Sequence, residues 1–211
     1  MKVQNKIDKF IFGVILAAGY SSRFGSEKLI VKIKGKPIIK HVAEKVNNST
    51  LHDFVIITGK NYPVIKNEIP EFENKIKKVP DNIAPLSFSI RFSLSLIPEN
   101  TDAVVFVLGD MPLITTGLIN RMIDKYIESG KKIIFPFHDN TIGNPKLFDK
   151  IYFDELKKVT GDRGGRDLVS LYQDDSAGIE VNNGNLFMDI DTEEDLERIS
   201  SIVGINSDSV H

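Results

Sequence analysis

The chain has 211 residues, with 27 Lys and Arg against 29 Asp and Glu, and its formal net charge is -2. This balance gives no overall positive field, so we expect no nucleic-acid partner, and local cations must meet any polyanionic ligand. Cys is absent, which excludes disulfides, thiolate metal sites and Cys nucleophiles. No segment approaches the about 20 apolar residues of a membrane-spanning helix, so we expect a cytoplasmic protein without a membrane partner.

The composition is that of a globular protein, with 41% hydrophobic and 27% charged residues. Residues 1–9 are polar and lack the apolar centre of a signal peptide, and residues 204–211 are polar as well. We therefore expect one domain over residues 10–203, flanked by a polar N-terminal extension and a polar C-terminal tail.

Apolar runs of strand length recur along the chain, at residues 10–17, 54–58, 103–108 and 132–137. They are rich in Val, Ile and Phe without polar alternation, which is typical of strands covered on both faces. Helices are predicted at residues 37–46, 116–129, 166–172 and 192–202. This alternation indicates an α/β, Rossmann-like fold with a mainly parallel central sheet, helices on both faces and ligands at the carboxyl ends of the strands.

Local signals mark the ends of two of these helices. Pro37 stands in a first-turn position of the first helix, where its missing N–H costs nothing. Thr115 or Thr116 can cap the start of the second helix, and Gly130 can end it in a left-handed conformation.

The loop after the first apolar run carries the strongest functional signal. Small residues end the run, and the following loop contains Gly25 and the cations Arg23 and Lys28. Small residues let the backbone pass close to a ligand, and free N–H groups in such a loop bind phosphate oxygens. Arg supplies a fork of donors and Lys a point charge to a polyphosphate. An ordinary turn is the alternative, but this order of residues favours a nucleotide site. The candidate nucleotide-binding residues are Leu16, Ala17, Ala18, Gly19, Ser21, Ser22, Arg23, Gly25 and Lys28, together with Gly109.

Two better-known phosphate loops are excluded. The pattern G-x-G-x-x-G does not follow this strand, and G-x-x-x-x-G-K-[ST] occurs nowhere in the chain. A nucleotide bound at this position would therefore be held by another kind of loop.

Asp110 follows the apolar run 103–108 and lies between Gly109 and a turn that Pro112 restricts. A carboxylate at the carboxyl end of a strand is well placed to bind Mg²⁺, which takes one or two carboxylates and fills its octahedron with phosphate oxygens and water. Mn²⁺ is the alternative ion. An Asx turn at Asp110 is the structural alternative, and the cationic loop upstream favours the metal.

Asp189 and Asp191 alternate on a short strand-like piece, residues 186–191, so their carboxylates are expected on the same side. Two acidic groups this close raise each other's pKa unless a cation lies between them. We take both as candidate metal ligands. Thr192 with Asp195 resembles a capping box at the start of the last helix, which gives Asp195 a structural role instead.

Residues 161–166, with the sequence Gly-Asp-Arg-Gly-Gly-Arg, place glycines beside cations just before a predicted helix. Helix N-termini bind anions readily. A phosphate-bearing acceptor is one interpretation of this segment, and a surface loop without a ligand is the other.

Taken together, these segments resemble the nucleotidyltransferases that complete the molybdenum cofactor. The first motif is Gly19-x-Ser21-x-Arg23-x-Gly25-x-x-Lys28 after Leu16-Ala17-Ala18. Four more segments match in chain order, at residues 109–112, 143–148, 161–166 and 189–196, so the resemblance extends from about residue 10 to residue 202. The first motif alone would also suit sugar-phosphate nucleotidyltransferases, whereas Gly-Asp-x-Gly-Gly-Arg with Gly-Asn-Pro-x-x-Phe favours the molybdopterin branch.

The resemblance implies a nucleotide-diphospho-sugar transferase-like fold and an Mg²⁺-dependent reaction. The terminal phosphate of molybdopterin would attack the α-phosphorus of a nucleoside triphosphate and release pyrophosphate. Asp110 and Asp191 would hold the metal, with Asp189 as a weaker candidate, while Arg23 and Lys28 would neutralise the leaving pyrophosphate. Arg23, Lys28 and Asp110 are thus the predicted catalytic residues.

The resemblance also implies a choice of base and a client. Leu16-Ala17-Ala18-Gly19 is similar to the cytidylyl branch, whereas the guanylyl branch has Gly in the place of Ala18. The expected nucleotide is therefore CTP, and the expected client is a molybdenum hydroxylase. A sugar- or polyol-phosphate nucleotidyltransferase and a non-catalytic molybdenum-cofactor chaperone are the alternatives.

The acceptor side is the least typical part of the match. Residues 87–96 alternate polar and apolar side chains, which by period predicts a strand, but the resemblance implies a Ser-rich turn and a helix facing the acceptor, and we expect the helix. The family more often has Asn near Val79, Gly near Pro85 and Gln at Met111. The acceptor-binding candidates are Ser87, Ser89, Arg91, Asn144, Pro145, Asp162, Arg163, Gly164, Gly165 and Arg166, and Lys146 would help to shape that pocket.

Overall fold

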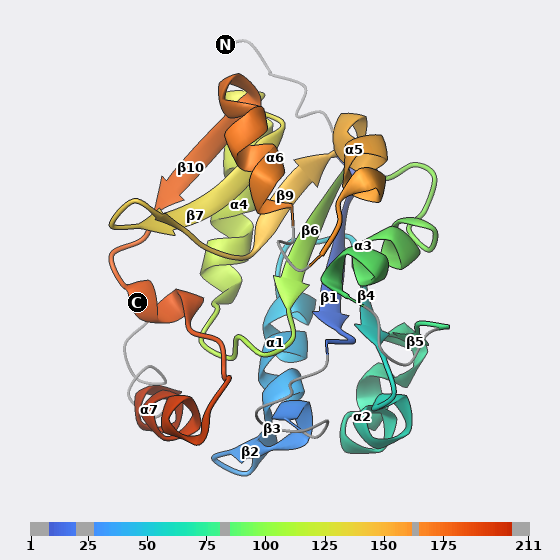
Figure 1. The fold of residues 1–211 in the computed structure, drawn as a ribbon, viewed down its shortest axis with the longest axis vertical. Helices are drawn as coiled ribbons and strands as arrows, with labels where there is room; N and C mark the ends of the chain where they lie inside the picture. The colour runs from blue at the N-terminus through green and yellow to red at the C-terminus, as the bar shows by residue number, and fades with distance from the viewer. Residues whose placement is uncertain (1–8, 20–27, 81–84, 162–164, 204–211) are drawn as a thin grey trace, which may run out of the picture.

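The computed structural model describes residues 9–19, 28–80, 85–161 and 165–203. Its centre is a sheet of eight strands between two layers of helices (Figure 1). Across the sheet the strands follow the order β10 (Ser176–Glu180), β7 (Ile133–His138), β9 (Lys146–Asp149), β6 (Ala103–Leu108), β1 (Ile11–Ala17), β4 (Asp53–Thr58) and β5 (Ile76–Lys78), with β8 (Thr141–Ile142) paired to β7. A separate hairpin joins β2 (Lys32–Ile33) to β3 (Lys36–Pro37).

The sheet is mainly parallel, as predicted. β6, β1, β4 and β5 pair in parallel, and so do β10 and β7. β9 runs antiparallel to both β6 and β7 and joins the two parallel groups. The carboxyl ends of β6, β1 and β4 therefore meet at one edge, where an α/β sheet binds its ligands.

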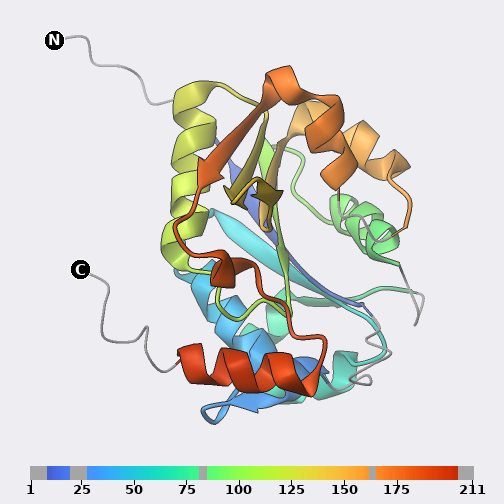
Figure 2. The same ribbon diagram turned by 60° about the vertical axis from the view of Figure 1, so that its left-hand side comes forward.

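Helices cover both faces of the sheet (Figure 2). One face carries α1 (Ile38–Asn47) and α4 (Thr116–Ser129), and the other carries α3 (Leu86–Leu94), α5 (Phe153–Lys158) and α6 (Arg166–Leu171). The remaining helices are α2 (Tyr62–Glu68) and α7 (Glu193–Val203), with short 3-10 turns η1 (Lys28–Ile30), η2 (Pro70–Lys75), η3 (Lys150–Tyr152), η4 (Gln173–Asp175) and η5 (Gly184–Phe187). Every described helix is too short or too polar to cross a bilayer.

Two hydrophobic cores explain why the strands lack polar alternation. Ile11 and Ile15 of β1 belong to the core under α1 and α4, whereas Val14 and Leu16 belong to the core under α3, α5 and α6. Successive side chains of a strand point to opposite faces. Because both faces are buried, apolar residues are needed at consecutive positions.

Several predicted helix ends are confirmed. The hydroxyl of Thr115 accepts a hydrogen bond from Leu118 N at 3.1 Å, and Gly130 ends α4 with a φ of 68°. The capping box also forms, because Asp195 N donates to the Thr192 hydroxyl at 3.1 Å and Thr192 N donates to Asp195 Oδ2 at 2.8 Å.

Residues 87–94 of the alternating segment lie in α3, so the expectation of a helix is confirmed and the strand period was misleading. Ser87, Ser89 and Ser93 lie buried on the inner face of α3. The Ser93 hydroxyl donates to Ile90 O at 2.7 Å, which satisfies it within the helix. Serine is small enough to occupy the packed face of this helix. The alternation of polar and apolar residues therefore does not indicate which side chains are buried in this segment.

Two expectations were wrong in detail. The piece 186–191 is not a strand, because Asn183 Oδ1 accepts from Asn185 N at 2.9 Å and starts the turn η5 instead. Pro37 is not in the first turn of α1 but ends β3 directly before it. The predicted N-terminal extension, apart from Lys9, and the predicted C-terminal tail lie outside the described residues.

Candidate active site

Gly109 brings the carboxyl ends of β6 and β1 together. Its N–H donates to Leu16 O at 2.9 Å. A Cβ at this position would lie 3.1 Å from Ile39 Cδ1 of α1 and 3.2 Å from Ala17 Cβ of β1, so a side chain here would crowd both neighbours. Glycine therefore sets where the next residue, Asp110, enters the edge of the sheet.

Lys28 joins three separate parts of the chain at this edge. Its side chain is only 9% exposed, and its Nζ donates to Asp110 Oδ2 at 2.8 Å and to Asp191 Oδ1 at 3.2 Å. Burial lowers the pKa of Lys28, but hydrogen bonds and the negative charges of the two carboxylates outweigh it and raise the pKa above its ordinary value. The side chain is therefore an ammonium at neutral pH.

Asp189 completes an acidic cluster with Asp110 and Asp191. One carboxylate oxygen from each residue lies within 4.8 Å of the others. Partial burial, followed by the negative charges of Asp110 and Asp191, raises the pKa of Asp189. Three converging carboxylate oxygens are the ligands that hard cations such as Mg²⁺ prefer, so this donor set fits a divalent ion.

The acceptor candidates on α3 face inwards or towards α5. Ser87 and Ser89 are 2% and 1% exposed, and within the described chain the Ser89 hydroxyl has no hydrogen-bond partner. Ser87 N donates to Gly161 O at 3.1 Å. Arg91 donates to Val159 O at 3.0 Å, so its guanidinium is engaged with the chain that follows α5.

A second group of acceptor candidates gathers at the turn before β9. The peptide bond between Asn144 and Pro145 is cis. Lys146 Nζ donates to Asn144 Oδ1 at 2.6 Å, and Arg166 donates to Ile142 O at 3.0 Å from the start of α6. Gly165 precedes Arg166 with a φ of 76°. The structure thus places Asn144, Lys146 and Arg166 around one turn.

Part of the predicted site falls outside the described residues. The candidates concerned are Ser21, Ser22, Arg23, Gly25, Asp162, Arg163 and Gly164. Gly19, two residues after the end of β1, is exposed.

Sequence reasoning missed Lys45, which supports the turn after Asp110. Lys45 lies on α1, and its Nζ donates to Pro112 O. The hydroxyl of Thr116 donates to Lys45 O at 2.9 Å. Burial, and then the positive charge of Lys36, lowers the pKa of Lys45 to about 8. No local pattern separates Lys45 from the other helical lysines, because its partner lies 67 residues away.

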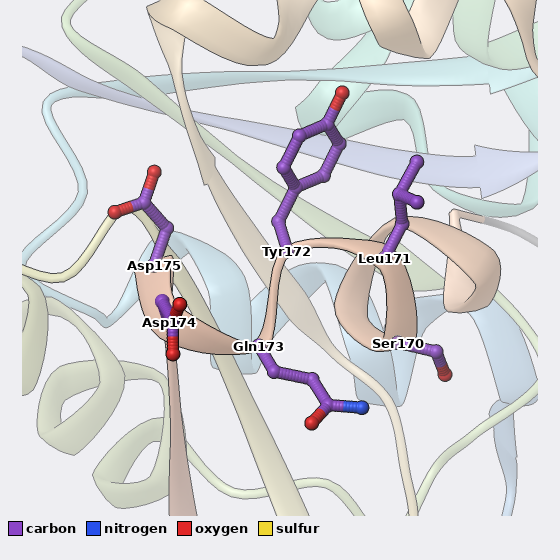
Figure 3. Close-up of a pocket in the computed structure, with 6 residues that line it drawn as sticks. All are labelled: Ser170, Leu171, Tyr172, Gln173, Asp174 and Asp175. Carbon is purple, nitrogen blue, oxygen red and sulfur yellow. The ribbon is translucent and has the colours of Figure 1, made fainter.

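A surface pocket of about 430 Å³ lies at the end of α6, lined by residues 170–175 (Figure 3). Asp175 O accepts from Lys132 N at 2.8 Å, directly before β7. The pocket therefore lies at the amino end of the parallel strands, opposite the acidic cluster. Asp175 also accepts a hydrogen bond from the Tyr152 hydroxyl at 2.5 Å, so its carboxylate is already engaged.

Comparison with known proteins agrees with this geometry. Residues 13–177 match the family described as "MobA-like NTP transferase domain". A probable molybdenum cofactor guanylyltransferase of Thermococcus sibiricus is 35% identical over 130 residues, 60% of this chain and 61% of that protein. One from Thermococcus kodakarensis is 25% identical over 199 residues, 91% of this chain and 95% of that protein.

A solved structure of the Mycobacterium tuberculosis protein Rv0371c in complex with manganese has a TM-score of 0.80 against this chain. It is 21% identical and covers 92% of this chain and 99% of that one, which shows a shared fold. From the match to the family over most of its length, the chain belongs to the MobA-like NTP transferases and is a nucleotidyltransferase.

Proposed function

We propose that this nucleotidyltransferase transfers a nucleoside monophosphate to the terminal phosphate of molybdopterin, and that residues 10–203 act as one catalytic domain. The observation that carries the proposal is the convergence of Lys28, Asp110 and Asp191 at the carboxyl edge of the sheet. The two Thermococcus relatives, named molybdenum cofactor guanylyltransferases, support the acceptor.

The chemistry needs positioning and charge rather than a general base. An oxygen of the acceptor phosphate, already ionised at neutral pH, forms a bond to the α-phosphorus while the bond to the bridging oxygen of pyrophosphate breaks. Asp110 and Asp191, with Asp189, would hold Mg²⁺ or Mn²⁺, which neutralises charge on the nucleotide phosphates when bound. The Lys28 ammonium, with Arg23 from the same loop, would stabilise the leaving pyrophosphate.

For the base, we propose GTP as the first candidate. The names of the relatives favour it. Ala18 is 7% exposed and belongs to the core under α3, so its methyl group packs inside the protein. CTP remains the second candidate, supported by the similarity of Leu16-Ala17-Ala18-Gly19 to the cytidylyl branch.

The decisive experiment measures pyrophosphate release from purified molybdopterin with each of the four nucleoside triphosphates. We expect release with GTP above the others. A preference for CTP would replace the first candidate by the second. Pyrophosphate release only with a sugar 1-phosphate would contradict molybdopterin as the acceptor. Tight binding of molybdopterin without pyrophosphate release would indicate a chaperone.

The metal assignment is tested by Asp110→Ala, for which we expect a loss of about 100-fold or more in turnover. Asp124→Ala is the matched control, because Asp124 is an exposed residue of α4. Both variants should retain the circular dichroism spectrum of the wild type. Wild-type turnover in Asp110→Ala would place the metal elsewhere.

A further inference from the structure

Two of the three carboxylates of the acidic cluster belong to a segment outside the sheet. Asp110 follows β6 by only two residues. Asp189 and Asp191 instead belong to residues 182–191, here called the aspartate segment, which leads from β10 through η5 to α7 (Figure 1). After η5 this segment is neither helix nor strand. Because it has no ladder of backbone hydrogen bonds there, contacts with other parts of the fold must fix where its carboxylates lie.

The aspartate segment contacts the β7–β8 hairpin through two glycines. A Cβ at Gly143, directly after β8, would lie 2.5 Å from Cδ1 and Cε1 of Phe187, the last residue of η5. A Cβ at Gly184, the first residue of η5, would lie 2.6 Å from Cδ2 of His138, the last residue of β7. Real Cβ contacts are essentially never shorter than 3.0 Å. Each side of the contact therefore provides a glycine against which a ring of the other side packs.

Backbone hydrogen bonds align the two sides of this contact. Val181, directly before the aspartate segment, donates from its N–H to Phe137 O at 3.0 Å, and its carbonyl accepts from His138 Nδ1 at 2.8 Å. On the hairpin side, Gly143 N donates to Pro136 O at 2.8 Å. Val181 is 3% exposed, so this first anchor of the segment is buried. The backbone is thus fixed on both sides of the ring contact.

Asp189 lies between two further anchors of the aspartate segment. Phe187 precedes it by two residues, which is about 7 Å of extended chain. The residue between them, Met188, is extended, with a φ of -70° and a ψ of 122°. Ile190 follows Asp189 and is fully buried in the core under α1 and α4. A shift of the Phe187 ring would therefore move Asp189, because only Met188 separates the two residues.

Asp191 is held from the other side. Its N–H donates to Asp195 Oδ2 at 3.1 Å, in the capping box that starts α7. This bond depends on α7 rather than on the hairpin. The contact of Phe187 with Gly143 therefore acts first on Asp189, and through it on the cluster, in which one carboxylate oxygen of each aspartate lies within 4.8 Å of the others.

Small displacements matter for such a cluster. Mg²⁺ binds oxygens at about 2.0–2.1 Å in a nearly octahedral arrangement. Residues that orient metal ligands without touching the ion change the metal affinity by about 10- to 100-fold when they are replaced. Phe187 is half-buried, so its ring contributes less to the core than a fully buried side chain would.

We propose that Phe187 and Gly143 are positioning residues of the metal site: the ring, packed against the glycine, holds Asp189 close enough to Asp110 for both to bind one divalent ion. The role of that ion rests on the proposed function, whereas the contact rests on the geometry of the hairpin and the aspartate segment. The β7–β8 hairpin, which carries no carboxylate of the cluster, thereby controls the affinity for metal.

The first test measures the affinity for Mn²⁺ alone, by electron paramagnetic resonance of the free ion, in Gly143→Ala and Phe187→Leu. The alanine methyl group would displace the ring, and leucine would remove it. Gly178→Ala is the matched control, because its methyl group would meet the Phe137 ring at 2.7 Å from β10. All three variants should melt at a lower temperature in EDTA. The Mn²⁺ affinity should fall about tenfold in the first two and stay within about twofold in Gly178→Ala.

Three outcomes of this test would overturn the proposal. An equal loss of Mn²⁺ affinity in all three variants would mean that the contact serves only the fold. Wild-type affinity in Phe187→Leu would mean that the ring does not position Asp189. A wild type that binds no Mn²⁺ would remove the metal site itself. Phe187→Leu adds no atoms to the packed turn, so the result does not depend on the folding of Gly143→Ala.

The second test combines the two substitutions. Leucine lacks the ring that the new methyl group would displace, so Gly143→Ala and Phe187→Leu remove the same contact. The double variant should therefore lose about tenfold in Mn²⁺ affinity, and not the about 100-fold that two independent losses would give. An additive loss would overturn the proposal, because the two residues would then act separately.

The third test uses turnover to separate positioning from catalysis. With GTP and molybdopterin at limiting MnCl₂, Phe187→Leu should release pyrophosphate about tenfold more slowly than the wild type. Saturating MnCl₂ should restore its kcat to within about twofold, whereas Asp110→Ala should not recover. A kcat that stays low in Phe187→Leu at saturating MnCl₂ would overturn the positioning role. If Mn²⁺ binding responds as expected but the wild type releases no pyrophosphate, only the proposed function fails.

Discussion

The Nζ of Lys28 lies 2.8 Å from Oδ2 of Asp110, a contact that joins the chain after β1 to the carboxyl end of β6. The same ammonium lies 3.2 Å from Asp191 Oδ1. One positive charge is thus shared by two carboxylates of a three-carboxylate cluster. A divalent ion that binds the cluster must compete with this ammonium, and that competition can be measured.

Lys28→Met should lower kcat about 100-fold or more, because the ammonium that stabilises the leaving pyrophosphate is lost. At the same time it should enlarge the rise in melting temperature that MnCl₂ causes, because the competing cation has gone. Lys32→Met is the control, since Lys32 pairs with Glu68 at 3.3 Å away from the cluster. A smaller metal-induced rise than in the wild type would contradict the competition.

Asp189→Asn should stabilise the metal-free protein and weaken its affinity for metal. The pKa of Asp189 is raised from 3.8 by partial burial and by Asp110 and Asp191. Because this carboxyl has a higher pKa in the folded state, ionising it lowers the free energy of unfolding at a pH above the folded pKa. Below pH 3.8 the carboxyl is protonated in both states and has no such effect. With EDTA at pH 7, Asn should therefore raise the free energy of unfolding by up to about 1 kcal/mol, since the carboxyl is partly solvated. The gain should vanish towards pH 3, and Asp124→Asn should show none. A lower stability in EDTA would contradict the prediction.

Lys45→Met should disturb the turn after Asp110 without touching either substrate. Lys45 donates to Pro112 O, so its loss frees the turn that carries the carboxylate. We expect kcat to fall about tenfold and metal affinity to fall with it, while the KM for the acceptor stays unchanged. Lys40→Met on the same helix is the control, because Lys40 pairs with Glu71. Unchanged metal affinity in Lys45→Met would rule out the positioning role.

Lys146→Met should make the protein more stable at pH 7. The folded pKa of Lys146 is about 8 against an ordinary value of 10.5. Charging the buried amine therefore costs folding free energy below about pH 8, and the cost disappears as the pH rises to 10.5. Urea unfolding should show a gain of up to about 3 kcal/mol at pH 7 that is lost by pH 10.5. A destabilised variant at pH 7 would contradict the prediction, because the ammonium and its hydrogen bond to Asn144 would then stabilise the fold.

Gly109→Ala should lower both stability and activity. The new methyl group would lie 3.1 Å from Ile39 Cδ1 and 3.2 Å from Ala17 Cβ, so these neighbours or the start of the Asp110 turn must give by a few tenths of an ångström. We expect a loss of about 1–3 kcal/mol in the free energy of unfolding and a fall in kcat. Gly117→Ala is the control, because its methyl group would meet only the Thr115 hydroxyl at 3.9 Å and Ala favours the helix α4. Equal melting temperatures of Gly109→Ala and Gly117→Ala would contradict the prediction that close packing around residue 109 requires glycine.

The elements with local signals could be predicted from the sequence. The run 103–108 is apolar at every position because both faces of β6 are buried, and Thr115 and Gly130 mark the ends of α4 through their own backbone geometry. The motif around Lys28 and Asp110 likewise pointed to phosphate and metal chemistry. These properties depend on residues that are close together in the chain, so the local sequence is enough to predict them.

Contacts between distant segments depended on the fold. The alternating serines of α3 are buried against the sheet. Lys45 donates to a carbonyl 67 residues away in the chain. Lys146 is a buried cation because β9 lies between β6 and β7 in the sheet. The sequence by itself determined the alternation of strands and helices and the residue types of the site. The tertiary structure decided which charged groups lie together, such as Lys28 with Asp110 and Asp191. The free energy of an ammonium or a carboxylate depends on its burial and its neighbours in space, and the order of residues does not specify these.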